Sequence, residues 1–252
     1  MIIDVRSAAM TYQSSDGEVE ALRDISFSMR EGEFCSIVGP SGCGKSTLLG
    51  AIAGLEALSG GEILVDGETV CAPSPKIALM PQRDQLFEWK TIWDNVMLGL
   101  RVQHQDTPQR RGQVKALLER YGLADFAQKR PSQLSGGMRQ RCALIRTLAT
   151  EPRILLLDEP FSALDYQTRL SVSADIHRIL RQEGKTALLV THDISEAVSM
   201  SDRVIVLSRR PAVVKNIHDL SSLQGLTPLQ RRDADTFHIY FNAIWKELDL
   251  HA

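Results

Sequence analysis

The chain has 252 residues, of which 24 % are charged and 43 % hydrophobic, and its formal net charge is −2. These values are ordinary for a globular protein, and the charge argues against nonspecific binding to nucleic acid. No apolar run approaches the roughly 18 residues that a membrane helix needs. The first residues lack the pattern of a signal peptide, and the four cysteines lack metal-ligand spacing. We expect a cytoplasmic protein with reduced cysteines.

The N-terminal segment, residues 2–38, has the pattern of strands and turns, and apolar and polar residues alternate over 25–30. Tyr12 is expected to end the first strand, before a polar loop at 13–17. An aromatic ring there could stack on a nucleotide base, or it could be a tyrosine at a sheet edge. The residue by itself leaves both interpretations open.

A phosphate-binding loop is predicted at 39–47, where the pattern of glycine, four residues and Gly-Lys-Ser/Thr is complete. The apolar run 34–38 precedes it as a buried strand, and a helix is expected over 45–54. Backbone N–H groups of such a loop surround a phosphate at the N-terminus of the helix. Lys45 is expected to reach the β- and γ-phosphates, and Ser46 to ligate Mg²⁺. The loop's predicted nucleotide-binding residues are Gly39, Ser41, Gly42, Gly44, Lys45, Ser46 and Thr47.

The middle of the chain changes from strands to helices. We predict a turn at 59–62, a hairpin around 63–67 and a short strand at 76–80. From Thr91 onward the apolar spacing is helical, and we interpret residues 83–150 as an inserted block of helices.

Alternating strands and helices resume after residue 150. The apolar run 154–157 is typical of a strand buried in a parallel sheet, and further strands are predicted at 187–190 and 204–207. Residues 209–232 have the pattern of a loop. The apolar stripe over 237–248 predicts an amphipathic helix, which we expect to dock on its own domain.

Two acids, Asp158 and Glu159, follow the buried strand 154–157. The first is placed to hold Mg²⁺, directly or through water, in a protein with a phosphate loop. The second can orient and deprotonate an attacking water molecule. Adjacent carboxylates near a polyphosphate need a cation between them, and Mg²⁺ would supply it.

A second candidate phosphate contact lies at 134–141, where Ser135, Gly136 and Gly137 open a helix. The hydroxyl, the accessible backbone amides and the helix dipole could bind a γ-phosphate. The segment lacks a lysine, so the phosphate must be held elsewhere. The simplest arrangement is a second copy of the chain facing the first.

The segments 39–47, 134–141 and 154–160, in this order, resemble those of the nucleotide-binding subunit of an ATP-binding cassette (ABC) transporter. The resemblance covers about residues 3–210. It implies an α/β fold: a P-loop NTPase core with a mainly parallel sheet, an N-terminal antiparallel β subdomain and an inserted α-helical subdomain.

The same resemblance implies how one ABC ATPase domain would be divided. Residues 1–82 and 151–210 would form the catalytic core with its antiparallel part, and 83–150 the helical subdomain. Residues 211–252 would form a C-terminal extension with the amphipathic helix.

The resemblance also implies roles for single residues. Tyr12 is similar to the aromatic residue that stacks on adenine, and Gln82 to the glutamine that senses Mg²⁺ and the attacking water next to the membrane subunits. Asp165 ends a loop that resembles the one crossing the dimer interface. His192 resembles the switch histidine that contacts the γ-phosphate, although a lone histidine is more often structural. The implied catalytic residues are therefore Glu159, His192, Gln82 and Lys45.

Within the family, the segments 80–83, 138–141 and 244–248 resemble the nitrate, sulfonate and taurine group of bacterial importers. Two departures are present. Residues 87–89 are Phe-Glu-Trp where that group often has Leu-Pro-Trp. Met138 stands where the family commonly has glutamine, so a side-chain hydrogen bond to the opposite ribose is not expected.

The expected function is that of an ATP-binding subunit that uses ATP and Mg²⁺ to drive solute uptake. It would work as a homodimer or with a paralogue, on a separate permease at the cytoplasmic face of the membrane, with a solute-binding protein as an indirect partner and no nucleic acid. The alternatives are the ATPase of an exporter or lipid-transport complex and, from a different class, a soluble ABC protein acting on DNA or the ribosome.

Overall fold

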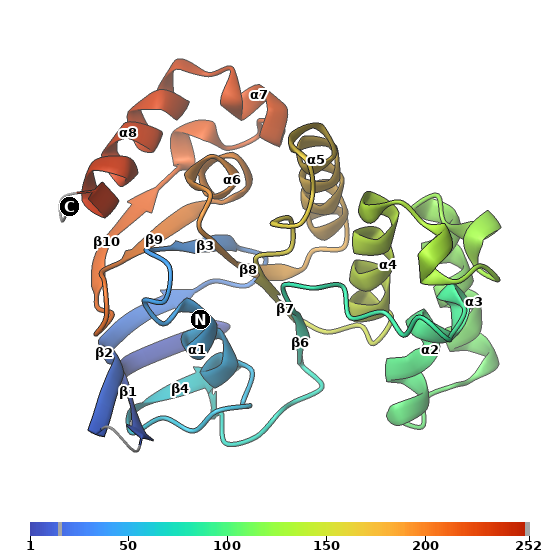
Figure 1. Cartoon of the computed structure of the whole chain (residues 1–252), viewed down its shortest axis with the longest axis horizontal. Helices are drawn as coiled ribbons and strands as arrows, with labels where there is room; N and C mark the ends of the chain where they lie inside the picture. The colour runs from blue at the N-terminus through green and yellow to red at the C-terminus, as the bar shows by residue number, and fades with distance from the viewer. Residues whose placement is uncertain (15–16, 250–252) are drawn as a thin grey trace.

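The core of the protein is formed by two β-sheets (Figure 1) in a computed structural model that describes residues 1–14 and 17–249. The smaller, antiparallel sheet has the order β2-β1-β4-β5, made of Gly17–Met29, Ile3–Ser14, Gly60–Val65 and Glu68–Thr69. The larger sheet has the order β10-β9-β3-β8-β7-β6, made of Val214–Asp219, Arg203–Leu207, Phe34–Val38, Thr186–Thr191, Ile154–Asp158 and Ile77–Met80.

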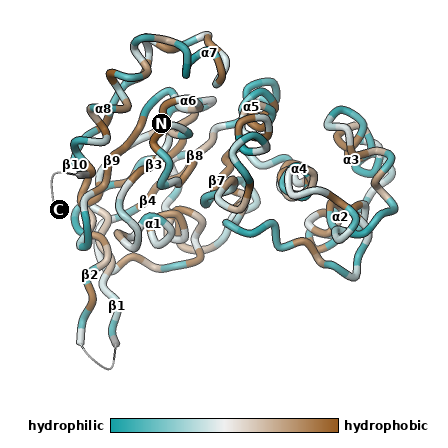
Figure 2. Tube along the Cα trace, turned by 45° about the horizontal axis from the view of Figure 1, so that its top comes forward, coloured by the Kyte–Doolittle hydropathy of each residue, from teal (hydrophilic) through white to brown (hydrophobic). Residues whose placement is uncertain are grey.

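Five strands of the larger sheet run parallel, and only β10 is antiparallel to its neighbour β9. Every residue of β3 and β8 is buried, because helices or the second sheet cover both faces. Figure 2 shows the hydrophobic residues along these central strands. The register pairs Val38 with Thr191, Asp158 with Val190 and Met80 with Leu157, so that four strands end together.

Several of the helices begin at polar caps. Thr91, Thr107, Ser135, Asp165 and Asp193 each accept a bond from a backbone N–H of the first turn. None of the helices in the described part has the length and apolar character of a membrane span. The α-helices are α1 Lys45–Ile52, α2 Ile92–Val102, α3 Pro108–Arg120, α4 Gly136–Leu148, α5 Tyr166–Gln182, α6 Ile194–Met200, α7 Pro228–Arg232 and α8 Asp235–Asp249.

The two faces of the larger sheet pack differently. Cys35 and Ile37 face the antiparallel sheet and α1, whereas Phe34 faces the helices. One continuous apolar cluster joins Leu155 and Leu157 of β7 to residues of α2–α5. The helical block is therefore attached to the sheet through a shared core.

The predicted α/β fold with an antiparallel N-terminal part is confirmed. The described residues between 83 and 150 contain helices and no strand, as expected. The division of the chain into core, helical subdomain and C-terminal extension stays a prediction. The amphipathic helix α8 docks on its own chain, with Phe237 and Ile244 buried against β9 and α6.

Three local predictions differ from the structure. Residues 59–62 were expected to form a turn, but β4 begins at Gly60 because it pairs with β1. The expected loop at 209–232 contains β10, a half-exposed edge strand that pairs with β9. Because its sequence is polar, this strand was not predicted. Tyr12 does not end the first strand, since β1 continues to Ser14 along β2. Residues 15–16 of the predicted 13–17 loop lie outside the described residues.

Gly61 provides a test of the packing between β1 and β4. Its φ is +75°, and a Cβ atom would lie 2.2 Å from the backbone oxygen of Ser7. We expect Gly61→Ala to lower the free energy of unfolding by at least about 1–2 kcal/mol, because the left-handed backbone alone costs that much. Urea denaturation would measure the change.

Gly112 is the matched control, because it lies exposed in α3 and a Cβ atom there would meet no other atom within 4 Å. Gly112→Ala should raise the free energy of unfolding by about 0.5–1 kcal/mol. Equal denaturation midpoints for the two variants would contradict the close approach of Ser7 to Gly61.

Candidate nucleotide site

The candidate site lies at the edge of the larger sheet where four parallel strands end. The loop 39–44 follows β3, and Gln82 follows β6. Asp158 is the last residue of β7, and His192 follows β8. Adjacent parallel strands present their carboxyl ends to the same crevice, so residues far apart in the sequence meet here.

The lysine of the phosphate loop forms hydrogen bonds with the backbone of the loop itself. Lys45 is only 6 % exposed, and its Nζ donates to the backbone oxygens of Gly39 at 2.8 Å and Pro40 at 2.9 Å. Gly42 and Gly44 have φ of +72° and +120°, where a side chain would be strained. Helix α1 has Gly44 as its N-cap and no side chain bonded to its first turn. The backbone N–H groups of this first turn and the helix dipole can therefore bind a phosphate.

The predicted metal ligands Ser46 and Asp158 lie side by side. Ser46 Oγ donates to Asp158 Oδ1 at 3.2 Å. Burial raises the pKa of the Asp158 carboxyl, and the nearby Glu159 charge raises it further. Such oxygen donors fit Mg²⁺, which usually takes its other ligands from water and phosphate. The described residues contain no group of three or more His, Cys, Asp or Glu side chains that could hold a metal by themselves.

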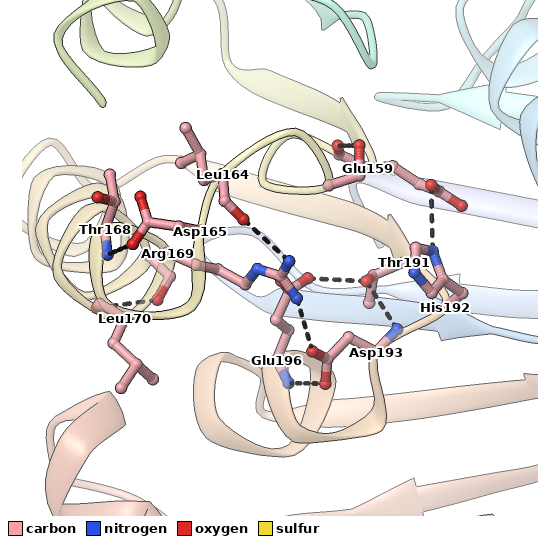
Figure 3. Close-up of polar contacts among 12 residues, drawn as sticks. Glu159, Leu164, Asp165, Thr168, Arg169, Leu170, Thr191, His192, Asp193 and Glu196 are labelled. Atoms are coloured by element: carbon pink, nitrogen blue, oxygen red, sulfur yellow. Dashed lines mark hydrogen bonds and ion pairs between the residues drawn. The ribbon is translucent and has the colours of Figure 1, made fainter. Parts of the chain in front are cut away.

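Gln82 and His192 both meet the Glu159 carboxylate. Gln82 Nε2 donates to Glu159 Oε2 at 3.1 Å. His192 Nδ1 lies 3.1 Å from the same oxygen (Figure 3). The Glu159 backbone has φ of +43°, and Ser162 Oγ donates to its carbonyl at 3.1 Å. A strained backbone that is fixed on several sides is typical of functional residues. The carboxylate is therefore held in one orientation, where it can accept a proton.

Tyr12 lies on β1 beside the end of the phosphate loop. Its hydroxyl donates toward Thr47 Oγ1 at 3.3 Å and contacts the Glu56 carboxylate. Burial and the bond to Glu56 raise the pKa of this hydroxyl. The side chain is 41 % exposed, which leaves ring surface available for a base. The hydroxyl bonds and the proposed stacking are compatible.

A cavity of about 300 Å³ lies between the phosphate loop, Gln82 and Glu159. A larger cavity of about 640 Å³ lies between α5 and α7, but none of the predicted site residues lines it. The chemistry of the lining, and not the volume, therefore identifies the site. The smaller cavity is lined by Ser41, Gly42, Gly44, Lys45, Ser46, Thr47, Gln82, Glu159 and Arg210.

Arg210 is a site residue that the sequence analysis missed. Its Nη2 donates to the backbone oxygen of Gly42 at 2.8 Å, across 168 residues of sequence. It belongs to the segment that was expected to be a loop, and no motif surrounds it. The only signal in the sequence was the pair of arginines at 209–210.

The residues of the second predicted phosphate contact do not line this cavity. Ser135 is an exposed N-cap of α4, and its Oγ accepts from the Met138 N–H at 3.3 Å. A Cβ atom on Gly137 would lie 3.0 Å from a Val172 methyl carbon, so glycine allows α4 to approach α5. Figure 1 shows α4 on the other side of β6 and β7 from α1.

Asp165 is also outside the cavity lining. It caps α5 by accepting from the Thr168 N–H at 3.1 Å. Hydrogen bonding by the Thr168 side chain, and then by the Thr168 backbone N–H, lowers the pKa of the Asp165 carboxyl. Within one chain, the structure thus brings together Lys45, Ser46, Gln82, Asp158, Glu159 and His192. It leaves Ser135, Gly136, Gly137 and Asp165 apart from them.

Comparisons with known proteins identify the family of this chain. The family model described as "ABC transporter" matches residues 22–162. The uncharacterized ABC transporter ATP-binding protein YtlC of Bacillus subtilis is 46 % identical over 240 residues, which cover 95 % of this chain and 92 % of that protein. The aliphatic sulfonates import ATP-binding protein SsuB of Cupriavidus necator is 46 % identical over 208 residues, or 81 % of this chain and 65 % of that one.

One similar solved structure is a dimeric post-hydrolysis state of the ATP-binding cassette MJ0796, bound to ADP and Pi. Its TM-score is 0.71 and its sequence identity 30 %, and the match covers 86 % of this chain and 98 % of the other. The fold of this chain is thus also found in a nucleotide-bound cassette.

Arg210 yields a prediction about nucleotide affinity. Its guanidinium contributes positive charge to a cavity suited to phosphate, and a charge-assisted bond adds affinity. Arg210→Ala should raise the dissociation constant for ATP about tenfold, which corresponds to about 1.4 kcal/mol. Titration with a fluorescent ATP analogue would measure it.

The exposed neighbour Arg209 does not line the cavity and supplies the matched control. Arg209→Ala should bind ATP as the unmodified chain does. The role of Arg210 is wrong if both alanine variants have the same affinity.

Proposed function

This chain belongs to the ABC transporter family and is an ATPase, and on this premise we propose that it powers import of a small solute through a separate membrane permease. The observation that carries the proposal is the convergence of Gln82 and His192 on the Glu159 carboxylate beside the phosphate loop. This arrangement suits ATP hydrolysis, because Gln82 and His192 both contact one oxygen of the carboxylate and so orient it.

The proposed chemistry is attack of water on the γ-phosphate of ATP. Glu159 accepts the proton of the water as the new P–O bond forms and the bond to the β-phosphate oxygen breaks, which yields ADP and phosphate. Lys45 would leave its carbonyl partners to bind the β- and γ-phosphates. Gln82 orients the water, and His192 supports the γ-phosphate. Mg²⁺ held by Ser46, Asp158 and Gln82 would neutralise charge on the phosphates.

A second copy of the chain would complete the site. Ser135 is exposed at the start of α4, Gly137 is buried two residues later, and neither lines the cavity of its own chain. They would bind the γ-phosphate of ATP held by Lys45 and Ser46 of the other copy, and Asp165 would lie at the same interface. The dimeric state of the similar cassette supports this arrangement. The partner would be an identical chain or a paralogue.

The surface near Gln82 is the proposed contact with the permease. Trp89 is 70 % exposed, and its ring lies 5.0 Å from that of Phe87, between Gln82 and α2. Aromatic residues are common anchors in interfaces between proteins. ATP-driven closure could reach a cytoplasmic helix of the permease through this surface, which would place the chain on the cytoplasmic face of the membrane.

The proposed solute is a small molecule of the nitrate, sulfonate or taurine type. The support is the resemblance of residues 80–83, 138–141 and 244–248 to that group, together with the similarity to the sulfonate import protein. The solute would reach the permease through a solute-binding protein, and no nucleic acid takes part.

Glu159→Gln tests the general base and the two-copy arrangement together. The amide cannot accept the proton, so turnover should fall by at least about a hundredfold while ATP binding remains. Because bound ATP is not consumed, the variant should elute as a dimer in the presence of ATP. Phosphate release and size-exclusion chromatography measure the two effects, and normal steady-state turnover would refute the assignment.

Purification of the tagged chain from detergent-solubilised native membranes tests the import function. We expect a permease with several membrane spans and a solute-binding protein, identified by mass spectrometry. A permease without a binding protein would favour an exporter. Recovery of soluble partners alone, with an active ATPase, would contradict the transport function.

A further inference from the structure

One arginine joins the loop 162–165 to the residues around His192 (Figure 3). Arg169 lies in the first turn of α5, where its backbone N–H donates to the backbone oxygen of Asp165 at 2.8 Å. Its Nη2 donates to the backbone oxygen of Leu164 at 3.0 Å. On the other side, its Nη1 donates to Asp193 Oδ2 at 3.4 Å. One guanidinium therefore holds both loops.

The loop that carries His192 is closed by its own hydrogen bonds. Asp193 caps α6 by accepting from the Glu196 N–H at 3.1 Å. Thr191 Oγ1 donates to Glu196 Oε2 at 2.8 Å and accepts from the Asp193 N–H at 3.0 Å. His192 lies between Thr191 and Asp193, so a shift of Asp193 changes where the imidazole lies relative to Glu159.

The third nitrogen of the guanidinium is poorly satisfied. Arg169 Nε is buried, and the described residues provide no hydrogen-bond acceptor for it. Glu196 Oε1 lies 3.8 Å away, close enough for an ion pair but too far for a hydrogen bond. Buried donors are nearly always bonded, and exceptions often have a functional reason. A small movement of Arg169 would complete this bond and change its contacts with both loops.

We propose that Arg169 is a positioning residue that transmits contact between loop 162–165 and a second copy of the chain to His192. It does not line the nucleotide cavity. Arg169 thus affects the rate at which bound ATP is hydrolysed and not how tightly ATP binds. This inference rests on the proposed two-copy arrangement.

Arg169→Gln tests the inference in the full-length chain. We expect kcat for ATP to fall about tenfold, with KM unchanged. Arg169→Lys keeps the charge but not the planar fork, and should recover part of the rate. Burial raises the pKa of Glu196 to about 7, so this carboxyl can take up a proton once the arginine charge is gone, and the Gln variant is expected to fold.

Arg178 is the matched control, because it lies on the same helix, where it pairs with Asp175 at 3.3 Å, and its side chain is largely exposed. Arg178→Gln should have normal kcat. Asp193→Asn keeps a capping oxygen but loses the charge that meets Arg169. Because the two residues act in one path, the Arg169→Gln/Asp193→Asn double variant should be no slower than Arg169→Gln.

Three results would overturn the inference: a normal kcat in Arg169→Gln, the same loss in Arg178→Gln, or additive losses in the double variant. Comparing the single variants Glu159→Gln and Arg169→Gln separates this inference from the proposed function. If Glu159→Gln alone forms no dimer with ATP, the two-copy arrangement is wrong. If that dimer forms and Arg169→Gln still turns over normally, only the role of Arg169 is wrong.

Discussion

The alignment of four parallel strand ends is the constraint on which the site depends. Side chains of a strand alternate between its two faces, so a slip of one residue would turn each of them to the other side. The buried strands β3, β7 and β8 resist such a slip, because it would move their hydrophobic side chains out of two different packed layers. The loop 39–44, Asp158 and His192 are placed together by packing that lies outside the site.

The charged side chains of the nucleotide site have contacts that neutralise them only in part. Lys45 is bonded to backbone oxygens, which are dipoles and do not neutralise it. Asp158 and Glu159 lie next to one another, and burial opposes the charge of Asp158. A bound nucleotide and its cation would supply opposite charges to both groups. The same residues are thus arranged for a ligand and not for maximal stability of the empty chain.

The helical block and the sheet share one apolar cluster, which limits how they can move independently. Two hydrogen bonds lie outside this cluster: Gln82 donates to Glu159, and Arg169 donates to Asp193 in the loop of His192. Both connect the Glu159 carboxylate to surfaces where a partner is proposed to bind. Hydrogen bonds between loops can change with small movements, whereas close-packed cores cannot.

The sequence by itself determined the phosphate loop at 39–47 and the acids Asp158 and Glu159, because each depends on consecutive residues and their local conformation. The fold and the roles of Gln82 and His192 followed from the order of the motifs through family resemblance. Only the tertiary structure decided the contacts of Arg210 and Arg169, which join segments that no local pattern relates. Arg210 donates to a backbone oxygen 168 residues away, and a backbone oxygen leaves no trace in the amino-acid sequence. Arg169 reaches the Asp193 carboxylate only because folding places α5 beside the loop of His192.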